Sequence, residues 1–185
     1  DVLSKTGACG PHGMTVAGNV GTKPLPIYPR VENVRFAGDI VHTNLPIAAA
    51  QRGYGAPQGH FAVESHMDEV ARDQNLDPIE FRKQNHVQEG DLDEIAAILA
   101  GDEAHKRKIR SCGMEECIDR GREAIGYDDL EQPEEEHLHR GIGLALVAQG
   151  SGVAGAELGA AHIKMNEDGS FILQVGGVDT GTGTD

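Results

Sequence analysis

A glycine-rich loop that leads into a helix is the stretch of this sequence best suited to binding chemistry. It reads Gln51-Arg52-Gly53-Tyr54-Gly55-Ala56-Pro57-Gln58-Gly59, with three glycines within seven residues. Glycines permit positive φ and close backbone approach, and Pro57 suits a first helical turn, where its missing N–H is not needed. Bare N–H groups beside a helix N-terminus favour an anionic ligand. An ordinary loop-to-helix transition has the same pattern, so the loop alone leaves both interpretations open.

A second glycine cluster, residues 176–183, follows a predicted strand near the end of the chain. Its backbone amides and a threonine hydroxyl are also suited to an anion. The cluster is similar to the phosphate loop of the actin and hexokinase type of ATPase. That loop lies in an opening hairpin, whereas this cluster ends the sequence and has no acidic partner motif upstream. A phosphate-loop ATPase is therefore a remote alternative.

Residues with helical spacing follow the first loop. After Pro57 an apolar stripe predicts a helix that packs on a sheet, and its members are Val63, Met67, Val70 and Ala71. Asp77 as N-cap, followed by Pro78, predicts a second helix to about Asn85. Among the polar residues, we expect Glu64 and Asp68 to be solvated or to balance the helix dipole, and His60 and His66 to be surface or packed residues.

The remaining elements predict an α+β fold in which helices precede a late, mostly antiparallel sheet. Further helices are expected at 14–20, 92–100 and 112–125, and the proline-rich residues 23–29 predict an extended crossing. Strands are expected at 31–44, 141–148, 159–165 and 171–178, with Asp168-Gly169 as the turn of a hairpin.

The acidic segment divides the chain. Residues 128–136 hold six acids in nine residues and predict a solvated connector. We therefore expect a first region at 1–130 with the central loop and helices, an acidic connector at 131–139, and a β-rich start of a further segment at 140–185. The sequence begins without methionine and stops inside a glycine motif, which is typical of a piece of a longer polypeptide.

Composition excludes several classes of partner. A net charge of −14 and a pI near 4.9 argue against nucleic-acid and anionic membrane surfaces. No apolar run approaches the roughly 20 residues needed to span a bilayer. The three cysteines, Cys9, Cys112 and Cys117, show no metal-ligand spacing or disulfide pattern. A reducing, cytoplasmic location is the simplest interpretation.

Four segments in order carry a resemblance to a known family. They are NVRFAGDIVHTNLP (33–46), RGYGAPQGHFAVESHMDEVARDQNLDPIEFRKQN (52–85), EGDLDE (89–94) and DGSFILQVGGVDTGTGTD (168–185). The chain resembles the molybdenum-cofactor subunit of the molybdenum hydroxylases, the family of xanthine dehydrogenase, aldehyde oxidoreductase and nicotinate dehydrogenase. The resemblance implies that the chain is part of a larger molybdopterin-binding subunit.

The resemblance also implies roles for loop residues. Gln51, Arg52 and Gly53 are expected beside the cofactor, with the backbone amide of Arg52 donating toward it. Tyr54 is expected over the substrate ring. A second aromatic residue, which completes the substrate clamp in xanthine dehydrogenase, aligns near Val153.

The second cluster is expected to hold the same cofactor through Gly181, Thr182 and Gly183. The family has glutamine at the position of Thr182, and the shorter threonine puts that side-chain contact in doubt. The arginine that orients purines falls near Val20, where no arginine stands. These departures argue against a purine, and a nicotinate-like N-heterocycle is preferred over a purine or an aldehyde.

The chemistry implied is hydroxylation with oxygen from water. The cofactor is molybdopterin, in bacteria the cytosine dinucleotide form, whose dithiolene sulfurs hold molybdenum without a side-chain ligand. FAD and 2Fe–2S clusters are expected in partner subunits or domains, together with the remaining part of the molybdenum subunit. The catalytic glutamate belongs to a motif beyond the end of this sequence, so no catalytic residue is assigned here. The competing hypothesis is a non-catalytic assembly or interaction fragment without cofactor.

Overall fold

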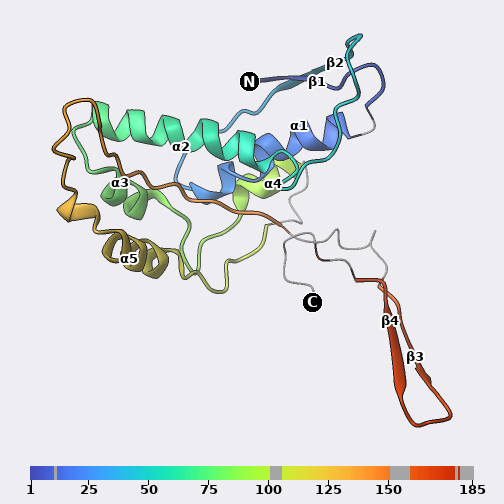
Figure 1. Ribbon diagram of the computed structural model, residues 1–185. Coiled ribbons are helices and arrows are strands. Elements are labelled where there is room, and N and C mark those ends of the chain that lie inside the picture. The colour runs from blue at the N-terminus through green and yellow to red at the C-terminus, as the bar shows by residue number, and fades with distance from the viewer. Residues whose placement is uncertain (11, 101–105, 151–158, 178, 180–185) are drawn as a thin grey trace. The chain divides into compact units, whose positions relative to one another are not determined.

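The structure is a computed structural model that describes residues 1–10, 12–100, 106–150, 159–177 and 179. It confirms the α+β class, with helices in the first part of the chain and an antiparallel pair of strands late in it (Figure 1). The chain divides into two compact units, residues 1–148 and 149–185. The predicted division into 1–130, 131–139 and 140–185 stays a prediction, and residues 140–148 belong to the first compact unit.

A short parallel pair of strands opens the first unit. β1 (Val2–Lys5) pairs with β2 (Gly38–Val41), with Val2 opposite Gly38 and Lys5 opposite Val41. The sequence did not predict β1, because its four residues lack a long alternating pattern. The strand expected at 31–44 is correct only at β2, since this is the part that lies beside β1 within the described residues.

Three helices form the body of this unit. They are α1 (Gly13–Thr22), α2 (Ala56–Asp73) and α3 (Pro78–Asn85). The prediction that the stripe of α2 packs on a sheet is wrong, because α2 packs against α1 and α3. The buried face of α2 is also rotated toward its polar side, and its residues are Ala56, Gly59, His60, Glu64 and Ala71.

The predicted cap of α3 is present. Asp77 caps α3 by accepting hydrogen bonds from the amides of Ile79 at 2.8 Å and Glu80 at 3.0 Å. The proline-rich segment differs from the expectation, because Pro24 starts one turn of 3₁₀ helix, η1 (Leu25–Ile27), instead of an extended crossing. Proline is tolerated in a first helical turn, which explains the difference.

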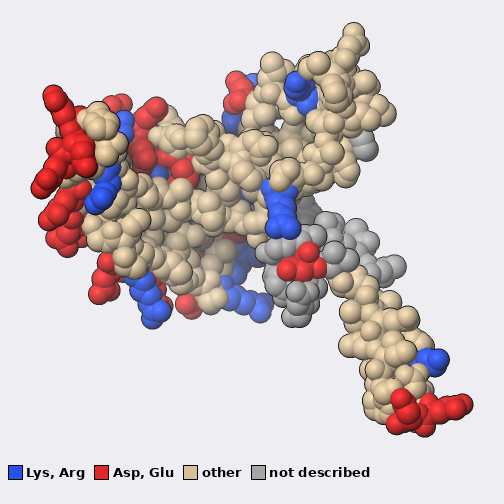
Figure 2. All heavy atoms as spheres, viewed as in Figure 1, with Lys and Arg blue, Asp and Glu red and all other residues tan. Residues whose placement is uncertain are grey.

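The later helices are α4 (Glu94–Ala100), α5 (Met114–Ile125) and the short η3 (Tyr127–Asp129). Acidic side chains gather at the end of the helical unit around α3, α5 and the segment that follows, as Figure 2 shows. The acids at 134–136 are exposed, and the role of the segment as a connector stays a prediction.

One apolar core joins the helices to residues 144–146. Its buried members are Ile27, Tyr28, Ile79, Ile118 and Leu146. The strand predicted at 141–148 is absent, although the segment is ordered against α2. Its backbone bonds to side chains of α2 in place of a neighbouring strand: Leu146 N donates to Glu64, and Ala148 lies beside His60.

The second unit contains the predicted hairpin. β3 (Ala161–Met165) pairs antiparallel with β4 (Phe171–Val175). Gly169 has a φ of 82° at the turn, and the Asp168 carboxylate accepts a hydrogen bond from the Ser170 amide at 3.0 Å. The turn chemistry of Asp168-Gly169 was therefore predicted correctly from the sequence.

Within the described residues, none of the helices combines the length and the apolar character that crossing a membrane requires.

Candidate cofactor-binding loop

The loop before α2 has an unusual backbone. Gly53, Tyr54 and Gly55 are three consecutive residues with positive φ, at 83°, 46° and 98°. The amide of Tyr54 donates to Gln51 O at 2.8 Å, and the amide of Ala56 donates to Gly53 O at 2.9 Å. A left-handed conformation at a non-glycine residue costs about 1–2 kcal/mol, so the surroundings of Tyr54 must hold it there.

Contacts with helix α1 keep Tyr54 in this conformation. Asn19 Nδ2 donates a hydrogen bond to the backbone oxygen of Tyr54 at 2.9 Å. A Cβ atom on Gly55 would lie 2.1 Å from Val16 O, and one on Gly59 would lie 2.1 Å from Val20 O. The two glycines therefore let the start of α2 touch the backbone of α1. The sequence analysis missed this support, because the contacts join residues about 35 positions apart.

The side chain of Tyr54 is also held. Its hydroxyl lies 2.6 Å from Nδ1 of His12, and the two rings meet edge to face with centroids 5.6 Å apart. The ring is half-buried at the loop surface. The predicted contact with a substrate ring stays a prediction, and the structure adds His12 as the residue that orients Tyr54.

The chain that approaches the loop is fastened to the segment after β1. Ala8 N donates to Leu45 O at 3.1 Å, Thr43 N to Gly7 O at 3.0 Å, and Ala48 N to Thr6 O at 3.0 Å. Gly7 has a φ of 76°, and a Cβ there would lie 2.2 Å from Pro46 O. The residues that lead into the loop are therefore held by the segment after β1, and the loop itself is held by α1.

Several backbone amide groups of the loop are available to bind a ligand. In the described part of the chain, the N–H groups of Gln51, Arg52, Gly53 and Gly55 have no hydrogen-bond acceptor. Gln51 and Arg52 are exposed, and the 18-residue helix α2 begins at Ala56, four residues after Arg52. Unpaired amides at the positive end of a helix dipole attract an anionic group. The loop therefore fits an anionic cofactor bound through its backbone.

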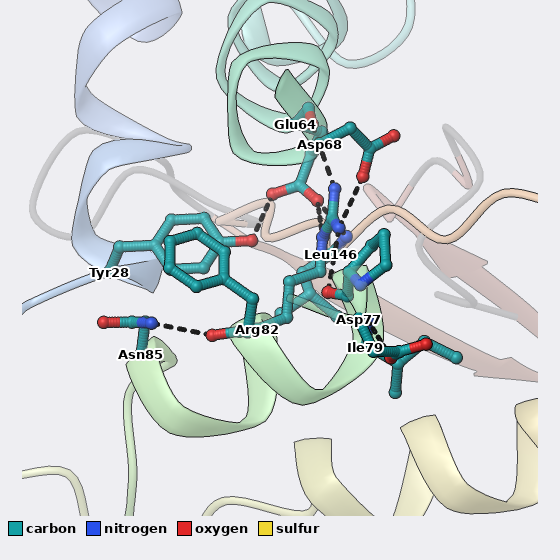
Figure 3. Close-up of polar contacts among 10 residues, drawn as sticks. Tyr28, Glu64, Asp68, Asp77, Ile79, Arg82, Asn85 and Leu146 are labelled. Carbon is teal, nitrogen blue, oxygen red and sulfur yellow. Dashed lines mark hydrogen bonds and ion pairs between the residues drawn. The ribbon is translucent and has the colours of Figure 1, made fainter. Parts of the chain in front are cut away.

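A buried ion pair lies about two and a half to three and a half turns further along α2. Arg82 is fully buried, and its Nε donates to Glu64 Oε2 at 2.8 Å while its Nη1 donates to Asp68 Oδ1 at 2.6 Å (Figure 3). Glu64 also accepts from the Tyr28 hydroxyl at 2.6 Å and from Leu146 N at 2.9 Å. The expectation that Glu64 is solvated was therefore wrong: an acid on the polar side of α2 is buried because it has a guanidinium partner.

Burial next to the ion pair changes the ionisation of Tyr28. Burial, followed by the hydrogen bond to Glu64, raises the pKa of the Tyr28 hydroxyl well above its usual value of 10.0. A hollow of about 290 Å³ opens beside Glu64 and Asp68, next to residues 143–145. Both carboxylates that line it are bound to Arg82, so neither is a free base. Asp68 remains partly exposed, and His60 is packed as predicted, with Nε2 2.9 Å from Ala148 O.

Comparisons with known proteins identify the family. Two family models, both described as molybdopterin cofactor-binding domains, match residues 1–86 and 120–185. The chain belongs to the molybdopterin cofactor-binding family of xanthine dehydrogenase and aldehyde oxidoreductase large subunits. The first matched region contains the complete loop at Gln51–Gly55, together with α1 and its Asn19.

Individual relatives of this family show how much of the subunit is present. The xanthine dehydrogenase molybdenum-binding subunit of Escherichia coli O157:H7 is 36% identical over 190 residues, which cover 100% of this chain and 24% of that subunit. The aldehyde oxidoreductase of Megalodesulfovibrio gigas is 31% identical over 158 residues, covering 84% of this chain and 16% of that protein. The chain thus spans a quarter or less of these two relatives.

A solved structure agrees with the fold. The crystal structure of the aldehyde oxidoreductase from Desulfovibrio desulfuricans ATCC 27774 superposes with a TM-score of 0.71 and 27% identity. The match covers 92% of this chain and 18% of that one.

The structure brings only part of the predicted site together. Gln51, Arg52, Gly53 and Tyr54 form the loop described above. The other predicted site residues lie outside the described residues: Val153 for the substrate, and Gly181, Thr182 and Gly183 for the cofactor. Among the described residues no cluster of three or more His, Cys, Asp or Glu side chains could hold a metal ion.

Proposed function

We propose that this chain is part of the molybdenum-binding subunit of a molybdenum hydroxylase. Its specific contribution is the loop Gln51–Gly55, whose backbone amides hold the anionic part of a molybdopterin cofactor. The observation that carries the proposal is the run of three left-handed residues at 53–55 beside amides without an acceptor. This run lies within the region matched to a molybdopterin cofactor-binding domain.

Each part of the loop has a task in this proposal. The amides of Gln51, Arg52 and Gly53 donate to the cofactor, and Asn19 keeps the peptide after them in place by binding the Tyr54 carbonyl. The ring of Tyr54, oriented by His12, contacts the substrate. Molybdopterin, once bound, supplies a molybdenum centre for hydroxylation with oxygen from water. The glycine cluster with Gly181, Thr182 and Gly183 is proposed to complete the cofactor site.

We infer a substrate class from the resemblance to the family together with the departures in this sequence. The relatives include xanthine dehydrogenase and aldehyde oxidoreductase proteins. Val20 and Val153 stand where a purine-specific arginine and an aromatic residue are expected. We therefore propose a nicotinate-like N-heterocycle ahead of a purine or an aldehyde, with electrons leaving through 2Fe–2S clusters to FAD in partner subunits or domains. The proposed location is the cytoplasm.

Elemental analysis tests the cofactor assignment. The complete protein, purified with its partners, should contain molybdenum and iron, and Gly53→Val should lose most of the molybdenum. A Cβ on Gly53 would lie 2.5 Å from Pro57 Cγ, and its φ is 83°, so a branched side chain distorts the loop. Gly121→Ala is the matched control, because a Cβ there meets nothing within 4 Å.

The outcomes separate the proposal from its alternative. Equal molybdenum in Gly53→Val and in the unaltered protein would exclude the loop as a cofactor site. Absence of molybdenum from the unaltered complete protein would favour the assembly or interaction fragment. Loss in Gly53→Val with retention in Gly121→Ala is the expected result.

A further inference from the structure

The β3–β4 hairpin has one apolar face and one mainly polar face. Its register places Ala161 opposite Val175, Ile163 opposite Leu173, and Met165 opposite Phe171. Residues that face each other across antiparallel strands project to the same side of a sheet. One side of the hairpin is therefore apolar at all six positions. The other side carries His162, Lys164, Ile172 and Gln174.

The apolar face is not covered by any other described residue of its own compact unit, residues 149–185. Its five large side chains, those of Ile163, Met165, Phe171, Leu173 and Val175, are between 60% and 67% exposed. Figure 2 shows the hairpin as a mainly uncharged surface with acidic side chains at its tip. A two-stranded hairpin is marginally stable alone in water, so a strand pair of this kind requires an apolar surface over it.

The remaining part of the subunit is the occupant that the observations favour. Aldehyde oxidoreductase contains a segment of the same fold, and 82% of its chain lies outside the match, since the match covers 18% of it. A second copy of this chain is disfavoured, because each copy has a net charge of −14 and its hairpin tip carries Glu167 and Asp168. We propose that the apolar face of β3–β4 docks on an apolar surface of the remaining molybdenum-binding subunit.

This inference rests on the proposed function and extends it to assembly. Strand β4 ends at Val175, directly before the glycine cluster that begins at Gly176. Docking of the hairpin therefore fixes the start of the segment to which we assign the second cofactor contact. The polar face, with Lys164 and Gln174, stays toward water.

Thiol labelling of the complete protein tests the docking. Ile163→Cys places a thiol on the apolar face, and Lys164→Cys places one on the polar face of the same strand. In the complete protein the thiol at 163 should react at least about tenfold more slowly, because a thiol under a packed interface reacts only through local opening. Peptide mass spectrometry distinguishes each new thiol from Cys9, Cys112 and Cys117.

Each outcome has a defined meaning when molybdenum is measured in the same samples. Slow labelling at 163 in a protein that contains the remaining subunit supports the proposal. Equal rates at 163 and 164 overturn it, and molybdenum in that sample would leave the cofactor function intact. Slow labelling in an assembly made only of copies of this chain also overturns it, because the occupant is then a second copy.

A second pair of variants tests the same surface by disruption. Leu173→Lys introduces a charge on the apolar face, whereas Gln174→Lys introduces the same charge on the polar face. Leu173→Lys should lower the fraction of this chain that elutes with the remaining subunit at least about tenfold, since it buries an unpaired ammonium. Gln174→Lys should leave elution unchanged. Full co-elution of the Leu173→Lys chain would overturn the docking.

Discussion

Replacing Arg82 with methionine removes the charge that permits burial of Glu64. The guanidinium makes four hydrogen bonds, to Glu64 Oε2, Glu64 O, Asp68 Oδ1 and Pro78 O. In Arg82→Met the Glu64 carboxylate keeps the Tyr28 hydroxyl and the Leu146 amide as donors but loses its counter-charge. Removing one partner of a buried ion pair costs about 3–5 kcal/mol. Because domains are stable by about 5–15 kcal/mol, this is a large share of the total.

A double-mutant cycle separates the ion pair from simple packing. In Arg82→Met/Glu64→Gln the buried group at 64 is neutral and still accepts hydrogen bonds, so the double variant should be more stable than Arg82→Met alone. We expect a coupling free energy of about 1–3 kcal/mol between the two positions. Urea unfolding of the 185-residue chain, followed by helical circular dichroism, measures all four states.

Two results would refute this reasoning. A loss below about 1 kcal/mol in Arg82→Met would mean that Glu64 finds water in the variant and does not need the guanidinium. Additive losses in the double variant would mean that the two side chains act independently. Lys83→Met on the same helix is a control, because Lys83 pairs with the exposed acids Asp119 and Glu115 and its loss should leave the unfolding midpoint nearly unchanged.

Three further predictions concern local features. Tyr28→Phe should reduce the loss of stability at alkaline pH. The pKa of Tyr28 in the folded chain is raised above 10.0, so the phenol contributes its full stabilisation below pH 10.0, and this contribution declines above pH 10.0 as the unfolded phenol ionises. Urea unfolding midpoints at pH 8 and pH 11 compare the two proteins. Gly55→Ala should destabilise the chain by about 1–3 kcal/mol through its φ of 98° and the contact with Val16 O, whereas Gly18→Ala in the open part of α1 should be neutral or stabilising by about 0.5–1 kcal/mol in the same unfolding assay. Asp77→Ala should cost about 1 kcal/mol by removing the cap of α3, and Asp77→Ser should recover most of it; equal midpoints for Ala and Ser would exclude capping as the cause.

Local signals account for the elements that were predicted well. The α2 helix has long helical periodicity, α3 has an Asp cap followed by proline, and the hairpin has Asp168-Gly169. Each of these elements could therefore be predicted from a short stretch of sequence. Strand β1 and the missing strand at 141–148 depended on partners far along the chain. A four-residue strand or an ordered extended segment carries no local pattern that identifies its neighbour.

The candidate site also has parts that the sequence predicted and parts that it did not. The glycine loop was recognised because residue types at 51–59 carry the backbone requirement directly, and its family resemblance was specific. Asn19 and His12, which orient the loop, carry no such signal, since each is an ordinary polar residue in a glycine-rich stretch. The burial of Glu64 had one readable sign: Glu64 and the fully buried Ala71 are seven residues apart, which places them on one helix face.

The hydrogen bonds of Glu64 form in a definite order as the chain is synthesised. Its partners lie 36, 18 and 82 residues away, at Tyr28, Arg82 and Leu146. During synthesis the carboxylate can meet Tyr28 and Arg82 long before the Leu146 amide has left the ribosome, and closing the longest loop carries the largest entropic cost. Residues 144–146 are therefore the last to join the core. A nascent chain arrested before residue 146 should leave Glu64 Oε2 with Arg82 as its donor and without the Leu146 amide, and should be a preferred target for chaperones.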